Sequence, residues 1–83
     1  MSRNDRRILL SEMTAGEDAI ILAIQGGRMV SSRLVSLGFT PGVQVNMVQN
    51  YGRGPLIATV RGTRVALGRG EAAKIIVERG VHE

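Results

Sequence analysis

The sequence predicts a mainly β fold, a small β-barrel with one inserted short α-helix over about residues 28–37. Short runs in which apolar and polar residues alternate cover much of the chain, as expected of strands buried on one face. In the second half, Arg-Gly pairs recur every eight residues, which is the turn spacing of short strands in a sandwich or barrel. Only in residues 28–37 do the apolar residues follow a helical spacing, because Val30, Leu34 and Leu37 fall on one helix face.

The first half supplies one strand and the helix. The segment EDAIILAI, residues 17–24, predicts a strand with Ile20, Leu22 and Ile24 on its core face. A pair of glycines then breaks the strand, and the helical period begins. Gly38 is expected to end the helix, because glycine readily adopts the left-handed conformation that closes a helix.

A turn and a second strand follow the helix directly. Residues 40–43 suit a type II turn, in which Pro41 presets φ at the second position and Gly42 accepts a positive φ at the third. Alternation over residues 43–49 predicts a half-buried strand whose odd-numbered apolar residues face the core. We therefore expect the helix to lie between the first strand and the rest of the barrel, and the turn to return the chain to the sheet.

The remaining chain is predicted to be β. A turn-rich break over residues 51–55 is followed by a strand, a tight hairpin turn that includes Gly62, and a return strand. A short loop or helical turn then leads into the last strand. These three strands are expected at residues 56–60, 63–67 and 74–78.

One domain is the organisation that 83 residues favour. We expect a flexible basic N-terminal arm over residues 1–9, the barrel over residues 10–79 and a frayed C-terminus over residues 80–83. The apolar runs are far shorter than the roughly 20 residues that a membrane helix needs. We therefore expect a protein that is not itself embedded in the membrane.

The sequence offers little that could support catalysis. It has no cysteine and a single histidine, His82, next to its last residue. The carboxylates are scattered singly, and no nucleophile and base stand in a catalytic pattern. We therefore expect no enzyme and no cofactor. A divalent metal such as iron or zinc is the alternative, if the fold gathers Glu17, Asp18, Glu71 and His82 in space.

The net charge of +4, with ten arginines among eleven basic residues, makes an acidic partner chemically reasonable. Binding of single-stranded nucleic acid requires aromatic platforms beside a basic groove. Phe39 and Tyr51 are the only aromatic residues, and Phe39 is expected to pack inward. We therefore expect no nucleic-acid partner, and a basic nucleic-acid-binding barrel is kept as the weaker alternative.

Four sequence patterns occur in order and with compatible spacing across roughly residues 10–79. They are G-x-x-A-x-I…I from Gly16, R-L-x-x-L-G-F-T-P-G-V-x-V from Arg33, G-P-L from Gly54 and V-R-G-T-R-V-A-L-G-R-G-E-A-A-K-I-I-V from Val60. In combination they resemble the FeoA family of bacterial ferrous-iron-transport accessory proteins. The resemblance implies an SH3-like small β-barrel with an added helix.

The same resemblance implies a function. It suggests a cytoplasmic protein that binds and modulates the cytoplasmic portion of a FeoB-type membrane iron transporter, a ferrous permease with a GTP-binding domain. A free edge of the barrel would also allow a homodimer. In the family pattern, Gly38, Pro41, Gly42 and Gly62 hold the fold.

The candidate partner-binding residues lie on the helix and in a long loop that we expect to lie next to it. An SH3-like barrel recognises partners through its loops and an edge groove. We therefore predict partner contacts for Arg28, Met29 and Arg33 on the helix and for Tyr51 and Arg53 in the loop. The alternatives are that Arg33 is a solvated helix residue and that Tyr51 is a half-buried anchor of its loop.

Overall fold

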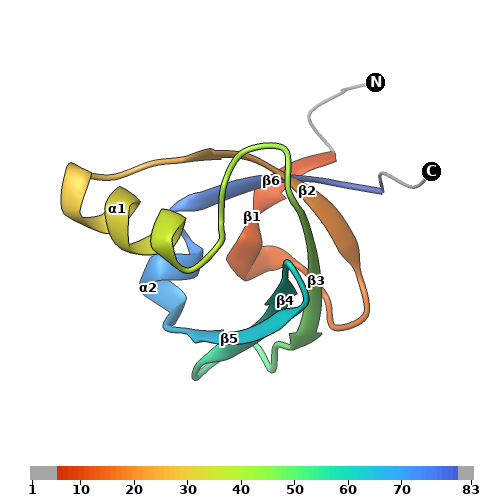
Figure 1. Ribbon diagram of the computed structural model, residues 1–83. Helices are drawn as coiled ribbons and strands as arrows, with labels where there is room; N and C mark the ends of the chain where they lie inside the picture. The colour runs from red at the N-terminus through yellow and green to blue at the C-terminus, as the bar shows by residue number, and fades with distance from the viewer. Residues whose placement is uncertain (1–5, 81–83) are drawn as a thin grey trace.

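The computed structural model describes residues 6–80, which form six strands, two α-helices and one 3₁₀ turn (Figure 1). In chain order the elements are β1 (Arg7–Leu9), η2 (Leu10–Glu12), β2 (Asp18–Ile24), α1 (Arg28–Ser36), β3 (Gln44–Gln49), β4 (Leu56–Val60), β5 (Thr63–Leu67), α2 (Arg69–Ala72) and β6 (Ile75–Arg79). The predicted mainly β fold with one inserted short helix is confirmed. Neither α-helix in these residues has the length and apolar character needed to cross a bilayer.

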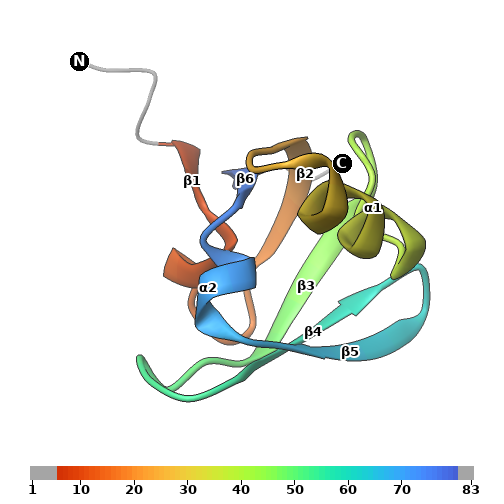
Figure 2. The ribbon, with the colours of Figure 1, turned by 90° about the vertical axis from the view of Figure 1, so that its left-hand side faces the viewer.

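All six strands belong to one antiparallel sheet in the order β1-β6-β2-β3-β4-β5. Figures 1 and 2 show the sheet curled into a small barrel-like shape, with α1 at one end. β2 pairs with β3 through Asp18–Ile20, whereas its pairing with β6 runs from Ala19 to Ile24. The chain leaves the sheet after Ile24 and forms α1.

The predicted N-terminal arm over residues 1–9 is wrong at its last three residues. Residues 7–9 form β1, with Ile8 opposite Val77 of β6, and Ile8 packs against the core. The strand forms because burial of this apolar side chain favours pairing with a segment at the far end of the sequence. The predictions for residues 1–5 and 81–83 lie outside the described residues.

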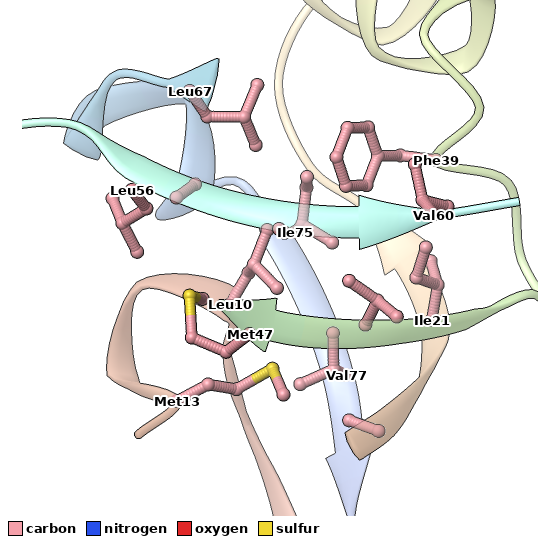
Figure 3. Packing of buried hydrophobic residues seen from close by; sticks show 14 of the residues in the cluster. Leu10, Met13, Ile21, Phe39, Met47, Leu56, Val60, Leu67, Ile75 and Val77 are labelled. Atoms are coloured by element: carbon pink, nitrogen blue, oxygen red, sulfur yellow. The ribbon is translucent and has the colours of Figure 1, made fainter. Parts of the chain in front are cut away.

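The core inside the curved sheet is apolar (Figure 3). Phe39 is its largest fully buried side chain, as the inward packing predicted for it requires, and Met13 and Met47 are buried with it. The buried members are Leu10, Met13, Ala19, Ile21, Leu34, Phe39, Val45, Met47, Leu56, Ala58, Val60, Leu67, Ala72, Ile75 and Val77.

The predicted core face of β2 is wrong. Ala19 and Ile21 are buried, whereas Ile20 and Leu22 are only half-buried. A bulge after Ile21 then shifts the pairing with β6, so that Ile24 packs against the core again. The nearly continuous apolar run has no polar residue to mark a face, and a bulge changes the period within it.

α1 ends in two hydrogen bonds that turn the chain towards the core. The N–H of Gly38 donates to the carbonyl of Val35 at 2.9 Å, and the N–H of Phe39 donates to that of Leu34 at 3.0 Å. Gly38 has a φ of 109°, a conformation that residues with a Cβ atom rarely adopt. This closure places Phe39 and Leu34 in the same buried cluster.

Two tight turns set the direction of the strands that follow them. The N–H of Val43 donates to the carbonyl of Thr40 at 3.1 Å, and Gly42 has a φ of 90°, as in a type II turn. Arg61 and Gly62 have φ values of 52° and 79° and join β4 to β5. Two positive values are the mark of a type I′ hairpin turn.

Candidate functional site

The outer side of α1 combines exposed apolar surface with positive charge. Met29 is 86% exposed and Val35 is 45% exposed. Arg28 at the start of the helix is also exposed. Arg33 forms an ion pair with Glu71 of α2, so it contributes to the fold as well as to the surface.

A shallow groove of about 520 Å³ runs along α1. Its walls consist of the glycines before the helix and of small serine side chains, with one arginine and one valine. Another chain could therefore approach the helix backbone closely. The lining residues are Gly26, Gly27, Arg28, Ser31, Ser32, Val35 and Ser36.

The loop between β3 and β4, residues 50–55, carries the other predicted contacts. Tyr51 is 77% exposed, so it is not the half-buried anchor that was the alternative. Arg53 is exposed in the same loop. The loop presents one aromatic ring and one cation to solvent.

Asn50 holds the start of this loop, a role that the sequence analysis missed. Its Nδ2 donates to the carbonyls of Ser11 and Met13, at 3.0 and 2.6 Å. Its Oδ1 accepts the N–H of Gly52 at 3.0 Å. The signal was available, because asparagine before a turn commonly bonds backbone groups two residues on.

Arg69 of α2 holds the same loop from the other side. Its guanidinium donates to the carbonyl of Gly54 at 3.0 Å, to that of Ser11 at 3.2 Å and to Oδ1 of Asn50 at 2.9 Å. These partners lie in two segments, the loop and η2, and both are distant from Arg69 in sequence, so no local pattern could have predicted the role. Arg69 ties α2, η2 and the loop into one unit.

The loop and the helix do not form one surface, contrary to the expectation that they lie next to each other. Figure 2 shows α1 and the β3–β4 loop at opposite ends of the molecule. α2 connects them, since Glu71 pairs with Arg33 of α1 and Arg69 holds the loop. The predicted residues therefore divide into two sites, one on α1 and one on the loop.

The central part of the chain carries only positive charge. From Ala19 to Gly70 the sequence contains six arginines and neither aspartate nor glutamate. This part includes α1, β3, β4 and β5. The exposed cations Arg28 and Arg53, one in each predicted site, are therefore suited to acidic groups on a partner. Arg33, by contrast, is already paired with Glu71.

The carboxylates that were candidates for metal binding have other partners. Glu17 accepts two hydrogen bonds from Arg79, at 3.0 and 3.2 Å, and Asp18 accepts one from Asn46 at 2.7 Å. Within residues 6–80 no three aspartate, glutamate or histidine side chains gather as a metal would require. The fourth candidate, His82, lies outside the described residues.

The Glu17–Arg79 pair should make stability depend on pH. The hydrogen bond from Arg79, followed by that from the N–H of Thr14, lowers the pKa of Glu17 below its ordinary value of 4.5. A depressed pKa stabilises the fold above the ordinary value, and this stability is lost as pH falls through the folded value. Because the pair is partly exposed, with side chains 28% and 34% accessible, we expect at most about 1 kcal/mol.

The measurement is urea unfolding of the protein and of Glu17→Gln between pH 7 and pH 3. The stability of the variant should fall less over this interval. Equal slopes for the two proteins would show that this carboxylate does not contribute to acid sensitivity.

Comparison with known proteins identifies a family match across most of the chain. The FeoA domain model matches residues 8–79. A candidate Fe²⁺ transport protein A of Methanocaldococcus jannaschii is 40% identical over 63 residues, 76% of each chain. A fusion protein of Porphyromonas gingivalis joins an Fe²⁺ transport protein A to an Fe²⁺ transporter FeoB, and is 34% identical over 70 residues. These residues are 83% of this chain and 8% of the fusion protein.

A solved structure agrees with the fold described above. The crystal structure of FeoA from Stenotrophomonas maltophilia, complexed with zinc, is described as a prokaryotic SH3 domain protein. It is 33% identical, superimposes with a TM-score of 0.77, and the match covers 86% of this chain and 89% of that chain. The small barrel-like sheet is therefore of the SH3-like type.

Proposed function

This chain belongs to the FeoA domain family, and from that premise we propose that it is an accessory protein of ferrous iron uptake. It acts in the cytoplasm, binds the cytoplasmic portion of a FeoB-type iron transporter and modulates it by protein-protein contact, without a catalytic step of its own. The fusion protein of Porphyromonas gingivalis carries the proposal. Joining two modules in one chain gives an effective concentration in the millimolar range, which suits modules that act on each other.

The outer side of α1 is the main contact in this proposal. Met29, 86% exposed, supplies an apolar anchor beside the groove, and Arg28 and Arg33 supply charge. A partner large enough to reach around α2 would also meet Tyr51 and Arg53. The two sites can therefore be tested separately.

Met29→Asp is expected to weaken binding of the transporter's cytoplasmic GTP-binding domain by about tenfold or more, the usual effect of removing an anchor residue. Isothermal titration calorimetry of the two purified proteins measures the affinity. Tyr51→Ala tests the loop in the same assay and is expected to have a smaller effect. The matched control is Gln44→Asp, which introduces the same charge at an exposed position of β3.

Equal affinities for Met29→Asp and Gln44→Asp would remove α1 from the contact. If the unmodified protein shows no heat of binding at high micromolar concentration, the proposed partnership is wrong.

Direct binding of a divalent metal is the second candidate function. It is favoured by the zinc complex of the Stenotrophomonas maltophilia relative. Anaerobic addition of ferrous iron to ¹⁵N-labelled protein tests it. Broadening confined to residues around Glu17, Asp18 or Glu71 would support a metal site, and an unchanged spectrum would exclude one at the concentration used.

A further inference from the structure

β5 leaves one edge of the sheet open. Among the strands of residues 6–80, it stands at the end of the strand order and pairs with β4 alone. The opposite edge strand, β1, has three residues, whereas β5 has five. A longer exposed edge presents more unpaired backbone groups to another chain.

The hairpin turn determines which backbone groups of β5 face outward. A two-residue type I′ turn makes the flanking residues, Val60 and Thr63, a hydrogen-bonded pair. Hydrogen-bonded and non-hydrogen-bonded pairs alternate along an antiparallel ladder, so the N–H and C=O groups of Arg64 and Ala66 point away from β4. Both residues are exposed. The edge therefore offers two donors and two acceptors, spaced for one added strand.

The side chains along this edge specify what the added strand should carry. Ala66 lies opposite Ile57 and Arg64 lies opposite Thr59 on β4. Ile57 is half-buried on the outer face, and Ala66 is small. A large apolar side chain on an added strand could cover Ala66 and reach Ile57, while an acidic side chain two residues away would lie beside Arg64.

The charge at this edge favours an acidic partner over a second copy. Neither Arg61 nor Arg64 takes part in the ion pairs found within residues 6–80. Two copies joined through β5 would place two Arg64 side chains on the same face as near neighbours, in chains that each have a net charge of +4. Like charges at this distance oppose the pairing.

We infer that the β5 edge is a strand-addition site for an extended segment of a partner protein, one in which an acidic and a large apolar residue alternate on the same face. Backbone pairing with Arg64 and Ala66 supplies the affinity, and the charge of Arg64 selects the segment. The inference goes beyond the proposed function, because it concerns a different surface and does not require the transporter to be the partner.

The test uses the full chain, labelled with ¹⁵N, and the peptide acetyl-Thr-Glu-Val-Val-Glu-Val-Thr-amide. The amides of Arg64 and Ala66 should exchange rapidly with solvent in the free protein, because they face outward. At saturating peptide both should exchange at least about tenfold more slowly, as newly hydrogen-bonded amides do. The Val65 amide, which faces β4, should change little.

Arg64→Glu should weaken peptide binding by about tenfold or more, because it replaces an attraction with a repulsion. Lys74→Glu is the matched control, since it makes the same change of charge at an exposed position between α2 and β6. Ala66→Pro removes one outward N–H while leaving the pairing with β4, and should also abolish binding. Arg64→Glu keeps the test valid if the proline variant does not fold.

Four results would overturn the inference. The first is that the peptide does not protect the amides of Arg64 and Ala66 at millimolar concentration. The second is that a peptide with lysine in place of glutamate protects these amides equally. The third is that protection grows with protein concentration in the absence of peptide, which would identify a second copy as the occupant. The fourth is that a single-stranded oligonucleotide protects the same amides, which would identify a nucleic-acid site.

Discussion

Phe39→Ala is expected to destabilise the domain by about 3–5 kcal/mol, the range measured when a buried aromatic side chain is truncated. Phe39 is fully buried and is the largest side chain of the core. Its position is set by the helix end, where its N–H bonds the carbonyl of Leu34, so the backbone cannot easily move to fill the cavity. Small domains have about 5–15 kcal/mol of stability in total, and the variant should be close to unfolding at 37 °C.

Thermal unfolding followed by circular dichroism measures the effect of this substitution. Tyr51→Ala is the matched control, because it removes the other aromatic ring from a position that is 77% exposed. The control should unfold within a few degrees of the unmodified protein. A loss below about 1 kcal/mol for Phe39→Ala would mean that the core collapses around the deleted ring.

Arg69→Ala is expected to cost about 2 kcal/mol, because hydrogen bonds to charged groups contribute more than neutral ones. The substitution would leave the carbonyls of Gly54 and Ser11 without this donor and would remove one of the two donors to Oδ1 of Asn50. Arg69→Lys should lose nearly as much, since one ammonium group cannot reproduce the fork of a guanidinium.

Urea unfolding gives the loss of stability, and exchange of the Gly52 amide reports on the loop, because that N–H bonds Asn50. Arg53→Ala removes the same type of side chain from an exposed position in the same loop and is the control. If the lysine variant were as stable as the unmodified protein, charge alone would account for the role of Arg69.

Features that depend on neighbouring residues were predictable from the sequence. The end of α1 and the turn that follows it were expected at the positions where they occur, because the backbone preferences of Gly38, Pro41 and Gly42 act locally. β1 was not predicted, since only pairing with a strand at the other end of the chain makes residues 7–9 a strand. The inner face of β2 was misjudged because both of its faces carry isoleucine or leucine.

The candidate site, like the fold, was predictable in its local features but not in those that depend on distant segments. The exposure of Met29 and of Tyr51 agrees with a contact role, but their separation by α2 depends on the packing of the whole chain. The ion pair between Arg33 and Glu71 and the contacts of Arg69 likewise join segments that are distant in sequence. Composition could indicate that an acidic partner is suitable, but not that the available edge is β5.

The position of β6 has a consequence for how the chain acquires its structure. β6 lies between β1 and β2 in the sheet, although it is the last strand in the sequence. While the chain is being synthesised, β1 has no strand partner and β2 lacks its longer pairing until residues 75–79 have left the ribosome. Pairings of such long range fold slowly and expose apolar surface until they form. The appearance of the final strand therefore sets the time at which a nascent chain can fold, even though α1 and the two tight turns are complete much earlier.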